Sequence, residues 1–73
     1  MPSLSERLNQ LKKEKGVLQK DIAGSIGISL RAYQYYEYGQ RNPDSETIIK
    51  LADYFNVSAD YLLGRSESPK RVE

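Results

Sequence analysis

The sequence predicts an all-α fold, a compact five-helix bundle with a helix-turn-helix at its centre. The first observation is a change of helical face at Gly27, since one apolar stripe at helical spacing precedes this glycine and another follows it. These stripes comprise Ile22, Ala23 and Ile26 before the glycine, and Ala32, Tyr33 and Tyr36 after it. The second observation is a series of helix-capping residues along the chain. The third is size, because 73 residues with 38% hydrophobic content suit one domain with a thin core.

The first helix is expected to begin at a capping box formed by Ser3-Leu4-Ser5-Glu6. In this motif the Ser3 hydroxyl accepts from the Glu6 amide, and the Glu6 carboxylate accepts from the Ser3 amide. Apolar residues at Leu4, Leu8 and Leu11 mark the buried stripe. The last turn over residues 12–15 is basic, and Gly16 is typical of the position just past a helix end.

Residues 19–38 predict the two helices of the helix-turn-helix. Ala23 is small enough to let two helices cross closely, and Gly27 can adopt the positive φ that ends one helix and turns the chain. In such a motif the second helix can enter the major groove of DNA. Function therefore depends on the residues that this helix exposes.

The remaining helices follow a loop over residues 39–43, which is punctuated by Gly39 and Pro43. Asp44 is expected to cap a fourth helix with a broad apolar face. That face comprises Ile48, Ile49, Leu51, Ala52 and Phe55. Ser58 is expected to cap a last helix from Ala59 to Leu63, which Gly64 closes.

The end of the chain, SESPKRVE, shows no apolar period. Segments of this composition cannot bury enough apolar surface to fold alone. We therefore expect one helix-turn-helix domain over residues 1–65 and a flexible tail or linker over residues 66–73.

The composition argues against an enzyme. The chain has no cysteine and no histidine, so it lacks a thiolate, the usual metal ligand and the usual acid or base at neutral pH. It also lacks a glycine-rich phosphate loop, a zinc-ligand spacing and a nucleophile elbow. We expect neither a metal nor another cofactor. No segment approaches the roughly 20 apolar residues of a membrane span, so we expect no membrane association and a cytoplasmic protein.

The net charge is only +1, but it is unevenly distributed. Residues 1–43 carry seven basic and four acidic side chains, whereas residues 44–73 carry four basic and six acidic ones. The basic half contains the predicted helix-turn-helix. Such asymmetry would orient the domain toward phosphate, although ordinary solvated surface is the alternative interpretation.

The segment from Leu4 to Gly64 resembles the phage repressor and Cro type of helix-turn-helix domain, the Xre-like or lambda-repressor-like family. The resemblance is carried by Gln19 at the start of the second helix, Ala23 and Gly27 at the helix crossing, Tyr36-Glu37 at the end of the third helix, the loop Gly39-Gln40-Arg41-Asn42-Pro43, and the segment Val57-Ser58-Ala59-Asp60-Tyr61-Leu62-Leu63-Gly64. The ordered set is specific, whereas each motif alone is not. Two residues depart from the family pattern, since Leu18 stands where Ser or Thr is frequent and Tyr33 where Ile or Val is usual.

The resemblance implies that the third helix reads DNA sequence with Leu30, Arg31, Gln34 and Tyr35. Arg31 can donate to guanine O6 and N7, and Gln34 can pair with adenine N6 and N7. Leu30 offers only an apolar contact to a thymine methyl group. Tyr35 can pack on a sugar or donate to a phosphate or a base edge. The alternative for Arg31, Gln34 and Tyr35 is a solvated surface side chain.

The resemblance also implies phosphate contacts on both sides of the groove. Gln19 lies at a predicted helix N-terminus, where free amides and the helix dipole favour an anion. Lys20 follows it, although exposed lysines are common for solubility alone. Gly39, Gln40 and Arg41 would hold the other side, and the alternative for Arg41 is a loop charge without a partner.

Two further roles come from the resemblance. Glu37 would pair with Lys12, where the family usually has arginine, so the pair keeps its charge and loses the bidentate fork. A recognition helix covers few base pairs, which implies a homodimer on two half-sites about 34–36 Å apart. The candidate dimer residues are Val57, Tyr61 and Leu62, whose alternative is burial within the monomer.

These observations predict a sequence-specific double-stranded DNA-binding transcriptional regulator that binds a palindromic operator. A repressor of phage or bacterial type is favoured over an activator, because occupying a promoter needs no activating contact. The main alternative is a protein-interaction module, antitoxin-like or adaptor, which the low net charge and the exposed Leu30 and Tyr35 leave open. Six tyrosines also suggest stacking on single-stranded nucleic acid through Tyr35 and Tyr38, although the other four fall at or beside apolar positions.

Overall fold

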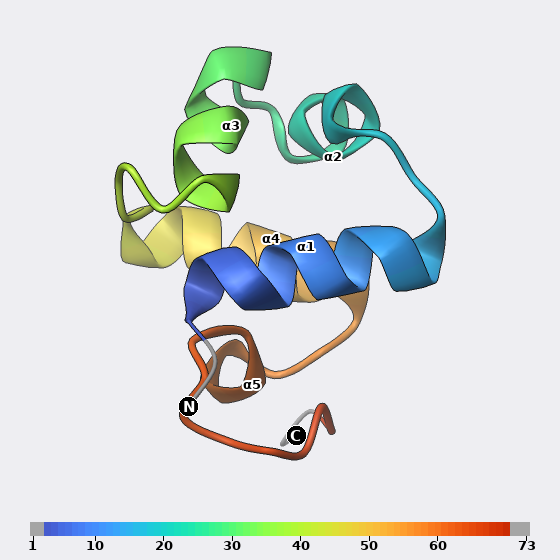
Figure 1. The fold of residues 1–73 in the computed structure, drawn as a ribbon, viewed down its shortest axis with the longest axis vertical. Coiled ribbons are helices and arrows are strands. Elements are labelled where there is room, and N and C mark those ends of the chain that lie inside the picture. Colours follow the sequence, from blue (N-terminus) through green and yellow to red (C-terminus); the bar gives the residue numbers. More distant parts are fainter. Residues whose placement is uncertain (1–2, 71–73) are drawn as a thin grey trace.

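A computed structural model describes residues 3–70, which form five helices and no strand (Figure 1). The helices are α1 (Leu4–Lys15), α2 (Gln19–Ile26), α3 (Leu30–Glu37), α4 (Ser45–Phe55) and α5 (Ala59–Leu62). The prediction of an all-α five-helix fold is confirmed. Helix α5 is one residue shorter than expected, because Leu63 is its C-cap and the chain turns at Gly64 with φ of 78°.

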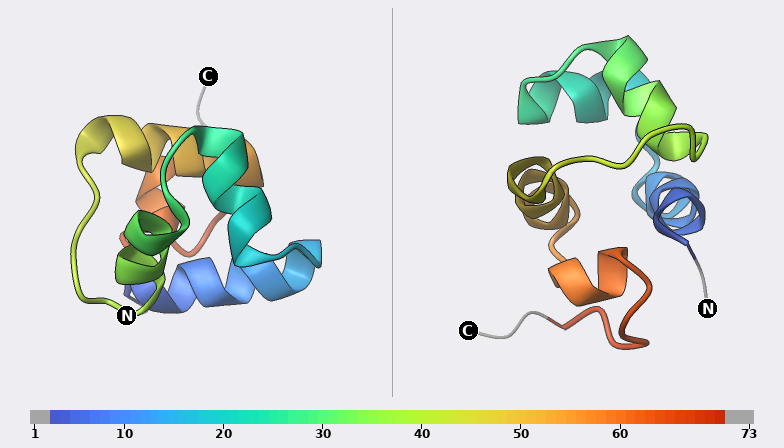
Figure 2. Two further views of the ribbon diagram at one scale, coloured as in Figure 1. Left: turned by 90° about the horizontal axis from the view of Figure 1, so that it is seen from above. Right: turned by 90° about the vertical axis from the view of Figure 1, so that its left-hand side faces the viewer.

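The helices are arranged in three layers (Figure 2). Helices α1 and α4 form the middle layer, with α2 and α3 on one side and α5 on the other. Helix α2 packs against α3 and α4, and α1 packs against α3 and α5. The helix-turn-helix therefore forms one outer face of the molecule, opposite α5.

Each helix contributes one fully buried large hydrophobic side chain to a single core. These residues are Leu8, Ile22, Tyr33, Leu51 and Leu62. Tyr33 is the largest of them, so the departure from the family's Ile or Val fills the space beneath α3 with a ring. Because all five helices bury hydrophobic side chains in this one core, the position of α3 depends on packing across the whole domain.

The turn between α2 and α3 has the expected backbone geometry. Gly27 adopts φ of 78° and its amide donates to the Ala23 carbonyl at 3.0 Å. At the other end of α2, Leu18 provides no side-chain cap, but the Asp21 carboxylate accepts from the Leu18 amide at 3.0 Å. Half of a capping box therefore replaces the usual Ser or Thr cap.

Two side chains lie differently from what the sequence pattern indicated. Ile49, expected in the buried face of α4, is 56% exposed, because α4 turns Leu51 and Phe55 toward the core instead. Arg7 is only 7% exposed, since it is covered where α1 meets α5. Neither environment follows from helical periodicity alone.

Residues 65–70 run back along α5. The Arg7 Nη2 group donates to the Ser66 carbonyl at 3.4 Å, and the Ser58 amide donates to the Pro69 carbonyl at 3.0 Å. Residues 71–73 lie outside the described part of the chain, so the expectation of a flexible tail or linker over 66–73 remains a prediction. None of the helices over residues 3–70 has the length and apolar character needed to cross a membrane.

Candidate functional site

Hydrogen bonds hold both ends of helix α3. Its outer face remains accessible. At its N-terminus the Ser29 hydroxyl accepts from the Ala32 amide at 3.1 Å. At its C-terminus the Glu37 carbonyl accepts from the Ser5 hydroxyl and from Asn9 Nδ2. Ser5 and Asn9 were not identified from the sequence, although their i, i+4 spacing on the polar face of α1 is a signal that could have indicated them.

Three of the four predicted base-reading residues lie together. Arg31, Gln34 and Tyr35 line a shallow hollow of about 220 Å³, with Tyr38 and Gln40 as its other lining residues. This hollow joins the outer face of α3 to the following loop. Tyr38, which sequence reasoning linked only to single-strand stacking, is therefore a neighbour of the predicted base readers.

Leu30 lies apart from those three residues. It is 43% exposed and lines a second hollow, of about 360 Å³, between the start of α3 and the start of α2. Leu18, which is 60% exposed, lines the same hollow. The outer face of α3 thus has an apolar end near α2 and a polar end near the loop.

The loop after α3 uses its backbone amides internally. The Gln40 and Arg41 amides both donate to the Tyr35 carbonyl, at 2.8 and 3.3 Å, and the Gly39 amide donates to the Tyr36 carbonyl at 3.2 Å. The Arg41 guanidinium lies 4.4 Å from the centre of the Tyr35 ring. Of the predicted phosphate-binding residues in this loop, Gln40 and Arg41 therefore have side chains to offer a ligand.

Lys12 and Glu37 lie together beneath α3. The distance from Lys12 Nζ to Glu37 Oε1 is 2.7 Å, and the Glu37 side chain is only 2% exposed. Burial by itself would raise the pKa of Glu37, but hydrogen bonds from Lys12 and Gln19, together with the neighbouring Tyr33 hydroxyl, outweigh it and lower that pKa below its ordinary value. Glu37 is therefore an ionised, buried carboxylate.

The same carboxylate affects the pKa of Tyr33. Burial and the nearby Glu37 charge raise the pKa of the Tyr33 phenol, so it stays neutral. Among the described residues, the Tyr33 hydroxyl and Glu37 Oε2 lack a hydrogen-bond partner of ordinary geometry. The Tyr33 hydroxyl therefore lies near the carboxylate without a well-formed hydrogen bond, while Oε1 accepts from Lys12 and Gln19.

Gln19 connects this buried pair to the surface. Its Nε2 donates to Glu37 Oε1 at 3.0 Å and to the Tyr38 hydroxyl at 3.3 Å. Its Oε1 accepts from Gln34 Nε2 at 3.1 Å. The predicted phosphate contact at Gln19 and the predicted base reader at Gln34 are thus members of one hydrogen-bond chain. Lys20 and Arg31 are exposed in the first turns of α2 and α3.

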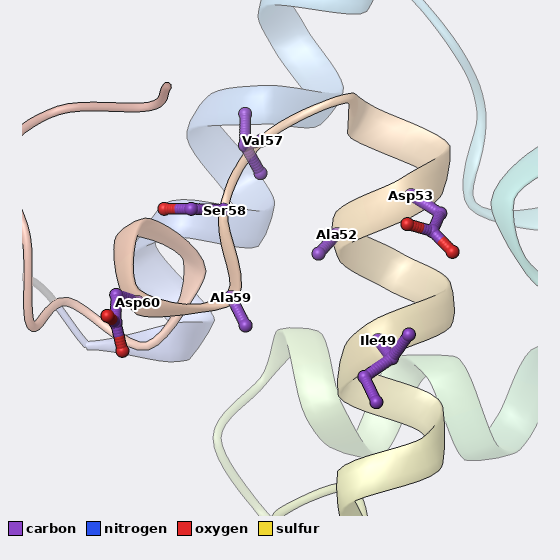
Figure 3. Close-up of a pocket in the computed structure, with 7 residues that line it drawn as sticks. All are labelled: Ile49, Ala52, Asp53, Val57, Ser58, Ala59 and Asp60. Carbon is purple, nitrogen blue, oxygen red and sulfur yellow. The ribbon is translucent and has the colours of Figure 1, made fainter. Parts of the chain in front are cut away.

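The predicted dimer residues Val57, Tyr61 and Leu62 lie in the core of the monomer, between 0% and 7% exposed. Beside them, α4 and α5 enclose a hollow of about 270 Å³ that Ile49 and Ala59 help to line (Figure 3). Of the three predicted residues only Val57 also lines this hollow, and the most exposed apolar side chain that lines it is Ile49.

The part of the chain from residue 3 to residue 70 contains no group of three or more acidic, cysteine or histidine side chains that could hold a metal ion.

A five-helix bundle whose central helix-turn-helix leaves the outer face of its second helix accessible is an architecture typical of nucleic-acid-binding domains. A family model described as Helix-turn-helix matches residues 8–62. The chain belongs to this helix-turn-helix family, of the phage repressor and Cro type known as Xre-like.

Curated relatives share sequence over almost the whole chain. The HTH-type transcriptional regulator ImmR of Bacillus subtilis is 39% identical over 71 residues, which cover 97% of this chain and 56% of ImmR. The cryptic phage CTXphi transcriptional repressor RstR of Vibrio cholerae is 40% identical over 70 residues, which cover 96% of this chain and 62% of RstR. The chain thus spans about three fifths of the length of these relatives.

Solved structures share the fold. A transcriptional regulator from Listeria innocua superposes with a TM-score of 0.81 at 38% identity, covering 90% of this chain and 62% of that one. The P22 c2 repressor in complex with a synthetic operator superposes with a TM-score of 0.84 at 24% identity, covering 90% of this chain and all of that one. The second likeness concerns the fold alone.

Proposed function

We propose that this domain binds double-stranded DNA sequence-specifically and regulates transcription as a repressor, with no enzymatic activity. The observation that carries the proposal is the outer face of α3, where Arg31, Gln34 and Tyr35 gather around one hollow. The core fixes α3 from below, and Ser5 and Asn9 hold its C-terminal end. A rigid helix with accessible or partly accessible hydrogen-bonding side chains on its outer face suits the major groove.

In this proposal each side chain on α3 has its own role. Arg31 donates to guanine O6 and N7, and Gln34 pairs with adenine N6 and N7. Tyr35 packs on a sugar or donates from its hydroxyl, and Leu30 contacts a thymine methyl group with its exposed apolar surface.

Phosphate contacts would set the register and supply much of the affinity. The Gln19 side chain is occupied by Glu37, Tyr38 and Gln34, so the backbone amide at the start of α2 is the group that Gln19 offers a phosphate. Lys20 adds a charge beside it. Gly39 brings the loop close to the groove, where the side chains of Gln40 and Arg41 contact the other phosphate strand.

The domain would bind a palindromic operator as a homodimer, because one recognition helix specifies too few base pairs alone. Contact between copies is proposed at the ends of α4 and α5, near Val57, Tyr61 and Leu62. Since these three side chains pack inward, the neighbouring Ile49 would supply the exposed apolar surface. A role in repression is supported by the similarity to RstR, a phage transcriptional repressor.

Selection of bound duplexes from a random DNA library tests the proposal. A shared two-fold palindrome, with half-sites about one helical turn apart, is the expected result. Binding should weaken steeply with added salt because phosphate contacts release counterions. Absence of enrichment at both low and moderate salt would overturn the proposal and favour a protein partner for α3.

A further inference from the structure

We propose that Glu37, acting through Gln19, restricts Gln34 to adenine and makes it reject guanine. The inference rests on the proposed function, since it concerns how α3 reads a base. It assigns Gln19 a role in specificity in addition to phosphate binding. The three residues form a continuous hydrogen-bond chain from the buried core to the reading face.

The first step is the direction of the Gln19 amide. An ionised carboxylate only accepts hydrogen bonds, so Glu37 Oε1 must receive an N–H from Gln19. The Gln19 Nε2 atom lies 3.0 Å from that oxygen. The flipped amide would set the Gln19 carbonyl against a buried negative charge, which is unfavourable in a low-dielectric site. Lys12, at 2.7 Å, keeps the carboxylate charged and in place.

The second step is the direction of the Gln34 amide. With its Nε2 committed to Glu37 and Tyr38, Gln19 presents Oε1 toward α3. An amide oxygen only accepts, so Gln34 must donate from Nε2, and these two atoms are 3.1 Å apart. The polarity imposed by Glu37 is thereby passed to Gln34.

The third step concerns the hydrogen-bonding groups that Gln34 still has available for a base. Its amide has two N–H groups, and Gln19 takes one of them. One N–H and the carbonyl oxygen remain, which match the N7 acceptor and the N6 donor of adenine. Guanine presents two acceptors, N7 and O6, and would need both N–H groups for a bidentate contact. The hydrogen-bond chain therefore discriminates between adenine and guanine, because Gln19 occupies one of the two Gln34 N–H donors.

The experiment compares selected sequences for the parent and for Gln19→Ala, with Gln34→Ala used to find the position that Gln34 reads. At that position we expect the parent to prefer adenine and Gln19→Ala to accept guanine, with the adenine preference reduced roughly tenfold. Other positions in the motif should keep their preferences. Lys20→Ala is the matched control, because its loss should weaken all sequences alike.

Glu37→Gln is a second variant that keeps the size of the side chain but permits either amide direction. It should relax the same position, provided that a thermal melt shows a folded domain. Unchanged adenine preference in Gln19→Ala, or a motif with no position sensitive to Gln34→Ala, would overturn the inference while leaving the proposed function intact. A parent that enriches no shared sequence would overturn the proposed function and the inference together.

Discussion

The guanidinium carbon of Arg7 lies 3.8 Å from the centre of the Tyr61 ring, where α1 packs against α5. Arg7 is buried, yet within residues 3–70 its side chain forms only two long hydrogen bonds, to Gln10 Oε1 and the Ser66 carbonyl, both 3.4 Å. Among the described residues its Nε has no partner. The contact of the guanidinium with the aromatic ring is therefore the main interaction that compensates for burying this cation.

Replacing Arg7 with alanine should lower the free energy of unfolding by roughly 1–3 kcal/mol, since the variant loses the stack and the packing of the side-chain stem. Arg7→Lys should recover little of this, because an ammonium group lacks the planar face. Urea denaturation measures both variants, with the exposed Arg65→Ala as control. Equal stability of Arg7→Lys and the parent would show that charge alone suffices at this position.

Acid should remove the stability that Glu37 contributes. Its pKa is lower in the folded state than its ordinary value of 4.5, because hydrogen bonds from Lys12 and Gln19, together with the neighbouring Tyr33 hydroxyl, outweigh burial. The contribution is therefore complete above the ordinary pKa and is lost as the pH falls through the lower, folded pKa.

Urea denaturation of the parent and of Glu37→Gln from neutral pH to about pH 3 measures this contribution. At neutral pH the variant should be less stable by roughly 1–3 kcal/mol, because Lys12 loses its charged partner. The difference should shrink on acidification. Asp44, whose pKa is lowered by its hydrogen bonds to Thr47, is present in both proteins and cancels. A difference that stays constant with pH would mean that Glu37 is not ionised in the folded protein.

The helix boundaries were predictable because they depend on local chemistry. Ser3 and Glu6 form the expected capping box, Gly27 takes the expected positive φ, and Asp44 caps α4 through the Thr47 amide at 2.9 Å. Each of these features is decided by residues within one turn of each other. The positions of these caps along the sequence then predicted the order of the helices.

The environments of Arg7 and Gln34 were not predictable, because they depend on residues distant in sequence. Arg7 carries a charge, which usually indicates surface, and its burial requires Tyr61 on the last helix. The contact of Gln34 with Gln19 requires two helices to cross at a particular angle with particular rotamers. Periodicity records which face is apolar, but not which polar side chains meet across elements.

Replacing Arg31 with alanine should cost roughly 1–3 kcal/mol of DNA-binding free energy and relax one base position, because a bidentate contact to guanine would be lost. Arg31 is exposed and lines the hollow on α3, so its loss should leave the fold unchanged. Binding to the selected operator and to its single-base variants measures the effect. Unchanged affinity and unchanged preference would remove Arg31 from the reading face.

Replacing Arg41 with alanine should weaken binding to all DNA sequences alike and flatten the salt dependence by about one unit, as expected for one lost phosphate contact. Titrations of operator and unrelated duplexes over a range of salt concentrations measure both effects.

Because the Arg41 guanidinium stacks 4.4 Å above the Tyr35 ring, the substitution also frees that ring. A loss confined to one base position would therefore show that Arg41 acts by holding Tyr35, and Arg41→Lys, which keeps the charge without the planar face, would then reproduce it. Arg65→Ala should change neither quantity, because Arg65 follows α5, which lies on the opposite side of the molecule from α2 and α3 (Figure 2).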